Sequence, residues 1–81
     1  MVNEEEVLKN LSELIGRQFD EDDIIIAFES DNGIIINKVV GQESNFDGFG
    51  KCDCYNAYEN IENSIIFTIY VSNSNEIVYI K

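Results

Sequence analysis

The first apolar positions along the chain recur at helical spacing and fall on one face: Val7, Leu8, Leu11, Leu14 and Ile15. Asn3, followed three residues later by Glu6, is typical of the capping box that begins a helix, and Gly16 is typical of a helix end. The pattern predicts an amphipathic helix over roughly residues 4–15, which needs an apolar surface to pack on.

Two runs rich in β-branched residues follow, and they predict a β-hairpin. Residues 23–29 and 34–40 flank Ser30-Asp31-Asn32-Gly33, whose Asn-Gly step favours the positive φ of a hairpin turn. With Glu29 opposite Ile34, one face collects Ile24, Ile26, Phe28, Ile35 and Val39. Asn37 falls on the same face and the other face is also apolar, so the register stays open.

A second hairpin is predicted from residues 65–71 and 77–80 around Ser72-Asn73-Ser74-Asn75. Pairing Val71 with Glu76 places five apolar residues on the expected core face: Ile65, Phe67, Ile69, Val78 and Ile80. The other face then collects Ile66, Thr68, Tyr70, Ile77 and Tyr79. We interpret the two tyrosines as cross-strand support, with a binding platform as the alternative.

The segment from 42 to 63 is too long for a structureless connection, so we expect it to hold an element of its own. The spacing of Cys54, Ala57, Tyr58 and Ile61 fits a short helix near residues 53–62, whereas "GKCDCY" fits an edge strand. Both alternatives stay open. The fold class predicted for residues 1–81 is a single α+β domain, with the N-terminal helix packed on a four-stranded antiparallel sheet of two hairpins.

Composition supports a folded chain. Its 81 residues are 44% hydrophobic, which is too apolar for a disordered acidic tail despite a net charge of −11. No apolar run reaches the roughly 18 residues of a membrane span, and Glu4, Glu5 and Glu6 stand where a signal peptide carries positive charge. We therefore expect a soluble, cytoplasmic protein.

The sequence offers few candidates for catalytic or metal-binding chemistry. It contains no His, the commonest general base and metal ligand, and its two cysteines, Cys52 and Cys54, cannot close a tetrahedral zinc site. We expect them to be reduced, structural thiols. The acidic stretches "DEDD" and "NFDGFG" lack the ligand pattern of an EF-hand loop. We expect no catalytic residue, no cofactor and no dedicated metal site.

The acidic residues are unevenly distributed. Residues 1–31 carry ten acids and two bases, net −8, and the remainder carries six acids and three bases, net −3. The five scattered bases leave no cationic footprint, so direct nucleic-acid binding is not expected. A concentration of negative charge is either a solvated surface that keeps the domain soluble or a contact surface for a cationic partner.

The run from Asp20 to Asp23 is the leading candidate for such a contact. On an extended chain, Asp20 and Asp22 would lie about 6.6 Å apart, on the order of the spacing of phosphates along one DNA strand. Nine acids are predicted to bind a basic nucleic-acid-binding protein: Asp20, Glu21, Asp22, Asp23, Glu5, Glu6, Glu13, Glu29 and Asp31.

In size and charge the chain resembles the small DNA-mimic and anti-defence inhibitors, such as anti-CRISPR, anti-restriction and uracil-DNA glycosylase inhibitor proteins. The resemblance is to a class and rests on composition. It implies a non-enzymatic inhibitor. Separately, the Ile- and Asn-rich, Pro-free composition is typical of a low-GC bacterium, its phages or mobile elements. The alternatives are an immunity protein that neutralises a basic toxin nuclease and a small dimerisation or interaction module. A monomer and a homodimer are both open.

Overall fold

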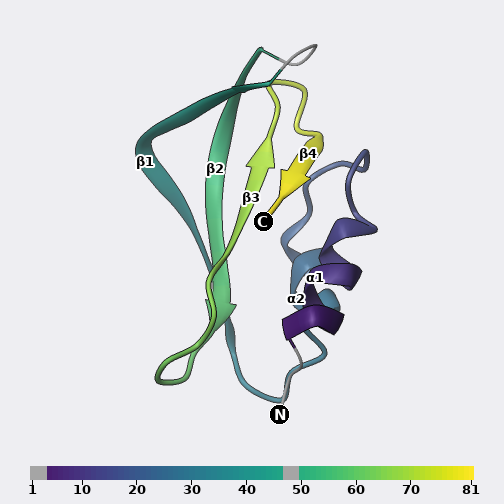
Figure 1. The fold of residues 1–81 in the computed structure, drawn as a ribbon, viewed down its shortest axis with the longest axis vertical. Coiled ribbons are helices and arrows are strands. Elements are labelled where there is room, and N and C mark those ends of the chain that lie inside the picture. Colours follow the sequence, from purple (N-terminus) through teal and green to yellow (C-terminus); the bar gives the residue numbers. More distant parts are fainter. Residues whose placement is uncertain (1–3, 47–49) are drawn as a thin grey trace.

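Two helices lie against one face of a four-stranded antiparallel sheet (Figure 1). The structure is a computed structural model that describes residues 4–46 and 50–81, with side chains described for 4–39 and 50–81. The elements follow one another as α1 (Glu4–Ser12), α2 (Glu21–Phe28), β1 (Ile34–Phe46), β2 (Gly50–Glu59), β3 (Phe67–Val71) and β4 (Ile77–Ile80). The strand order β1-β2-β3-β4 joins two hairpins side by side, which confirms the predicted α+β class.

Helix α1 is three residues shorter than predicted, and its predicted apolar face is buried only in part, since Leu8 and Ile15 are 36% and 41% exposed. Val7 and Leu11 are buried within the helix, whereas the chain tightens after Ser12 into turns in which the Leu14 N–H donates to the Leu11 carbonyl at 2.9 Å. Gly16 follows with φ of +92°, a conformation that favours glycine. The predicted cap at Asn3 lies outside the described residues.

The predicted first hairpin is wrong, because residues 21–28 form helix α2. The Asp20 side chain caps this helix by accepting a hydrogen bond from the Asp22 N–H at 2.9 Å. Ile24, Ala27 and Phe28 are its buried residues, at the i, i+3 and i+4 spacing of a helix face. Three successive isoleucines favour a strand in isolation, but the cap and this burial pattern outweigh that propensity.

The face predicted to unite Ile24, Ile26 and Phe28 therefore does not exist. Ile24 and Phe28 point into the core, whereas Ile26 is 71% exposed. Residues 30–33 form the connection from α2 to β1 instead of a hairpin turn. Within that connection, the Gly33 carbonyl accepts the Asn60 N–H at 2.7 Å, so the start of β1 is fixed beside the end of β2.

Strand β1 pairs with β2, which comes from the segment for which the sequence allows either a short helix or an edge strand. The helix predicted near residues 53–62 is wrong, because these residues belong largely to strand β2. The strand alternative is correct, but β2 lies between β1 and β3 and is not an edge strand. Ile36 pairs with Ala57 and Lys38 with Tyr55, before the register shifts between Lys38 and Glu43. The positive φ at Gly50, 73°, opens β2.

The β3–β4 hairpin is confirmed, but its predicted register is wrong. Val71 pairs with Ile77 and Tyr70 with Tyr79, so β4 contains one extra residue, a β-bulge. The bulge brings both Ile77 and Ile80 into the core. Val78, predicted for the core face, packs instead against a separate cluster of Cys52, Cys54 and Tyr70. Ile65, also predicted for the core face, is 48% exposed.

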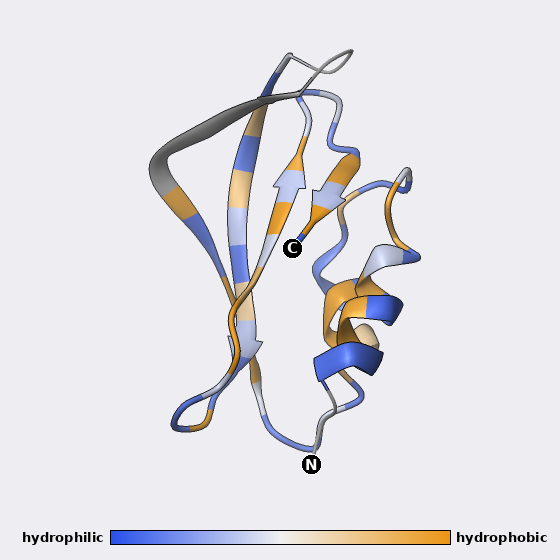
Figure 2. Cartoon of the chain, in the orientation of Figure 1, coloured by the Kyte–Doolittle hydropathy of each residue, from blue (hydrophilic) through white to orange (hydrophobic). Residues whose placement is uncertain are grey.

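The main core lies between the helices and the sheet and takes buried residues from both layers. Figure 2 shows hydrophobic residues in the two helices and in β3 and β4. The Phe28 ring meets the Phe67 ring edge-on, with 5.6 Å between their centroids. Phe19, from the segment between the helices, stacks on Tyr55 at 4.5 Å. The helical layer is thus attached to the sheet through β2 and β3 as well as β4.

Replacing Leu11 by Ala should lower the free energy of unfolding by about 2–5 kcal/mol, because a fully buried side chain leaves a cavity. Ile26→Ala is the matched control, since its side chain is 71% exposed and Ala favours helix. Urea unfolding at neutral pH measures both. Equal losses for the two variants would contradict the placement of α1 in the core.

Candidate functional site

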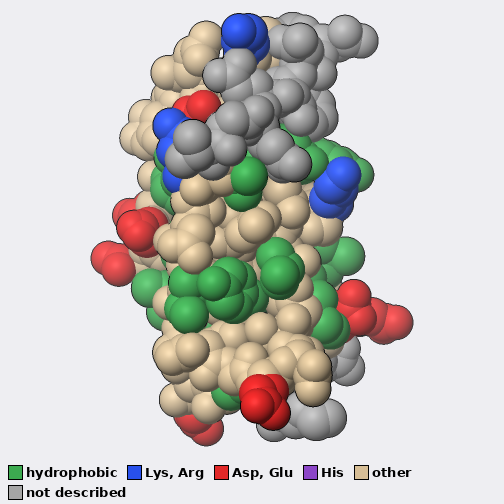
Figure 3. All heavy atoms as spheres, turned by 90° about the vertical axis from the view of Figure 1, so that its left-hand side faces the viewer, with side chains coloured by type: hydrophobic (Ala, Val, Ile, Leu, Met, Phe, Trp, Pro, Cys, Tyr) green, Lys and Arg blue, Asp and Glu red, His purple; other side chains and the backbone are tan. Residues whose placement is uncertain are grey.

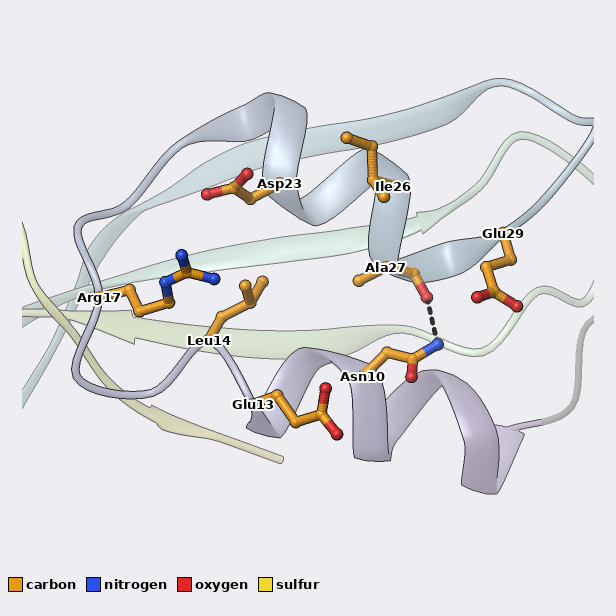
Figure 4. A pocket seen from close by; sticks show the side chains of 8 residues that line it. All are labelled: Asn10, Glu13, Leu14, Arg17, Asp23, Ile26, Ala27 and Glu29. Carbon is orange, nitrogen blue, oxygen red and sulfur yellow. Dashed lines mark hydrogen bonds between the residues drawn. The ribbon is translucent and has the colours of Figure 1, made fainter.

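A groove of about 240 Å³ lies between α1, the turn that follows it, and α2. The helices run antiparallel, with the Asn10 side chain donating to the Ala27 carbonyl at 3.1 Å across the groove (Figure 4). The lining residues are Asn10, Glu13, Leu14, Arg17, Asp23, Ile26, Ala27 and Glu29. The groove is therefore built entirely from the helical layer.

Three carboxylates and one guanidinium line this groove, so its formal charge is −2. Figure 4 shows Arg17 and Asp23 toward the start of α2 and Glu29 at the end of α2. Glu29 is held there by its role as the C-cap of α2, with φ of 49° and its N–H donating to the Ile26 carbonyl. The negative potential in the groove favours a cationic ligand.

The groove also offers apolar surface. Ile26 is exposed at its edge, and Leu14 and Ala27 contribute side chains that are mostly buried. Lys and Arg side chains combine an aliphatic stem with a charged head. A basic side chain of a partner can pack its stem on Ile26 and direct its head toward Glu13 or Asp23.

The structure brings together only three of the nine predicted contact residues, Glu13, Asp23 and Glu29. Asp20, Glu21 and Asp22 are exposed outside the groove lining, at the start of α2. Glu5 and Glu6 lie in the first turn of α1, and Asp31 lies in the α2–β1 connection. All nine belong to the helical layer and its connection to the sheet.

The phosphate-like spacing predicted for Asp20 and Asp22 is wrong, because these residues stand at the N-terminus of a helix. There the backbone N–H groups and the helix dipole attract negative charge. Asp20 supplies the cap, and Glu21, Asp22 and Asp23 occupy the first turn. The local concentration of acids thus has a structural cause that is independent of any partner.

Sequence reasoning missed Asn10, Arg17 and Ile26 as groove residues. The β-branched run "IIIAF" favours a strand and so places Ile26 on a sheet face, and nothing in the sequence distinguishes Arg17 from the four other scattered bases. The available signal was an acidic cap and first turn before apolar residues at helical spacing. A prediction that lacks helix α2 cannot include the groove, because residues of α2 form one of its sides.

The carboxylate of Glu59, outside the groove, lies at the end of β2. It accepts hydrogen bonds from the Ser30 hydroxyl at 2.6 Å and from the Asn32 amide at 3.1 Å. These bonds, the one from Ser30 first, lower the pKa of Glu59 below its ordinary value of 4.5. Glu59 therefore links the α2–β1 connection to the sheet and has a structural function.

The two cysteines are free and buried on the side of the sheet away from the helices. Burial above all, and then the nearby Cys54 and Asp53, raise the pKa of the Cys52 thiol, which disfavours the reactive thiolate. Within residues 4–46 and 50–81, no group of three or more Cys, Asp or Glu is arranged to hold a metal ion.

Comparison of the chain with known protein families, curated proteins and solved structures finds no match. Among the described helices, none has the length and apolar character needed to cross a membrane. The groove and the charge distribution are therefore the observations from which function is inferred.

Asp20→Ala should lower the free energy of unfolding by about 0.5–2 kcal/mol, because the Asp22 N–H loses its acceptor. Asp20→Asn is the matched control and should cost less, since the Asn side chain can accept the same bond. Chemical denaturation at neutral pH compares the two variants. Equal losses would mean that the charge of Asp20, and not its capping bond, stabilises α2.

The stability contributed by Glu59 should depend on pH. Because its folded-state pKa is lowered, this contribution is complete above the unfolded pKa and is lost as pH falls through the folded pKa. The difference in unfolding free energy between wild type and Glu59→Gln should therefore be constant from neutral pH down to about 5.5 and shrink below about 4.5. A difference that does not change with acidification would contradict the role given to the Ser30 and Asn32 bonds.

Proposed function

We propose that this protein is a small non-enzymatic inhibitor that binds the cationic, nucleic-acid-binding surface of a nucleic-acid-handling protein through its helical layer. The observation that carries the proposal is the separation of charge between the two layers. All ten acids of residues 1–31 belong to the helical layer or its connections, and nine are exposed, with Asp23 half-buried. The opposite face of the sheet has few charges.

A net charge of −8 on one layer produces a directional field. At physiological salt the Debye length is about 8 Å, so a cationic partner is attracted toward this layer before contact is made. Such steering raises association rates and suppresses wrong orientations. A cationic nucleic-acid groove is the kind of surface that presents many basic residues together.

The α1–α2 groove supplies the specific contact within this field. Charge alone attracts a partner without fixing its position, whereas the exposed Ile26 beside Glu13 and Asp23 provides an apolar contact flanked by carboxylates. Interfaces gain most of their affinity from a few well-packed side chains of this type. We therefore assign the groove to one basic side chain of the partner, and the remaining acids to steering.

The proposal is tested first by searching for an inhibited enzyme. Purified CRISPR effector nucleases, restriction enzymes, DNA glycosylases and basic toxin nucleases are each bound to fluorescently labelled nucleic acid, and the protein is titrated in. Loss of anisotropy in proportion to added protein, reversed by excess unlabelled nucleic acid, is the expected result for the target. An inhibited toxin nuclease would identify an immunity protein, and an inhibited defence enzyme would identify an anti-defence protein.

Substitutions then test the surface. Glu13→Gln with Asp23→Asn should slow association with the inhibited enzyme at least about fivefold at low salt and flatten its salt dependence. The matched control, Asp53→Asn with Glu62→Gln, removes the same charge from β2 and the β2–β3 connection, outside the helical layer, and should change the rate much less. Arg17→Gln should accelerate association, because it removes the positive charge from the groove.

Equal effects of the two double variants would show that only net charge matters and would contradict a role for the groove. Inhibition that is insensitive to salt would contradict the electrostatic mechanism itself.

A further inference from the structure

The sheet face that points away from the helices, which we call the outer sheet face, has a different chemistry from the helical layer. Figure 3 shows hydrophobic side chains in a band across the middle of this view, with acidic and basic side chains toward its margins. Ile36, Ala57 and Ile69 belong to the core on the inner side, so the alternation of strand side chains places their sequence neighbours on the outer side.

The strand register arranges these outer residues in rows. The middle row is polar: Asn37 pairs with Asn56, and Asn56 with Thr68, whose hydroxyl donates to Asn56 at 3.4 Å. Thr68 in turn exchanges two backbone hydrogen bonds with Lys81, which ends the row at the edge of the sheet. Next to it, Ile35 pairs with Tyr58, whose hydroxyl accepts from the Asn37 amide at 3.2 Å.

The row on the other side of the polar one is aromatic. Tyr70 pairs with Tyr79, and their ring centroids lie 5.8 Å apart. Tyr79 is 44% exposed. Lys81 lies at the margin, with its ammonium 5.7 Å from the centroid of the Tyr70 ring. Lys81 thus contributes a positive charge at the β4 margin, whereas the described side chains that β1, β2 and β3 place on this face are uncharged.

We propose that two copies of this chain associate through their outer sheet faces. Each copy carries a net charge of −11, so contact through the helical layers would oppose two surfaces of −8 each. Contact through the outer sheet faces instead leaves the helical layers on opposite sides of the assembly. The charge distribution therefore selects this face for a second copy, whereas a basic partner is attracted to the other one.

The pattern on the outer sheet face is also suited to contact with itself. A two-fold interface places the same patch on both subunits, so the patch must be self-complementary. The row of amides and a hydroxyl can hydrogen-bond to the same row of a second copy, because amides and hydroxyls both donate and accept hydrogen bonds. The apolar residues on either side of this row can then pack against each other. Four strands of five residues cover on the order of 19 by 17 Å, or roughly 320 Å² on each copy. This is less than the roughly 800 Å² per partner of a standard stable interface, so the contact is a weak, transient one.

Such a dimer should be weak and strengthened by salt, which screens the repulsion between copies. This prediction is independent of the proposed function, because salt should weaken binding to a cationic partner. Sedimentation velocity from about 10 to 500 µM protein, at about 0.05 and 0.5 M NaCl, measures the average mass. We expect it to rise with concentration from 9.2 kDa toward twice that value, and to rise further at high salt.

Asn37→Asp places a carboxylate in the middle row without changing side-chain size, and should weaken dimerisation at least about tenfold at low salt. Asn73→Asp is the matched control: it adds the same charge at an exposed residue of the β3–β4 turn and should have a much smaller effect. Unfolding midpoints confirm that both variants are folded.

A monomeric mass under all conditions would overturn the inference. A dimer that is unaffected by Asn37→Asp, or equally weakened by Asn73→Asp, would overturn it as well, since the contact would then lie elsewhere or depend only on net charge.

Discussion

The segment that joins the two helices is hydrogen-bonded to the β3–β4 hairpin, and the rest of the structure depends on this attachment. The Gly16 N–H donates to the Ile77 carbonyl at 2.7 Å, the Ile77 N–H donates to Arg17 at 2.9 Å, and the Phe19 N–H donates to Asn75 at 2.8 Å. These bonds fix the turn between α1 and α2 at the edge of the sheet. Both helices must then direct their apolar faces toward the same side, where Leu11, Ile24 and Ile77 are fully buried.

The charge distribution follows from this arrangement. Because the inner faces of both helices are occupied by the core, their carboxylates can only point outward. The acids at the start of α2 are further favoured by the helix dipole, so a concentration of like charge that would be unfavourable on a strand is stabilised at this position. The same side chains that define the helix start also create the acidic surface.

The two faces of the molecule therefore differ in the interactions that they favour. The helical layer attracts cations over a distance, and its groove offers an apolar contact at Ile26. The outer sheet face offers short-range contacts instead, through Ile35, Tyr58 and Tyr79 and the amides between them. Because the layers lie back to back, a ligand on one face leaves the other accessible.

The sequence by itself determined the α+β class, the β3–β4 hairpin, the acidic bias of residues 1–31 and the burial of Val7, Leu11 and Leu14, because each depends on local periodicity, turn residues or composition. Only the tertiary structure decided that "DEDDIIIAF" is a helix, since Ile24 and Phe28 become buried at helical spacing only against the sheet. It also decided the bulge in β4, which places Ile77 in the core and Val78 outside it, while Ile80 stays in the core as predicted. The groove lay beyond sequence reasoning for the same reason: Glu13 and Asp23 meet only once two helices pack together.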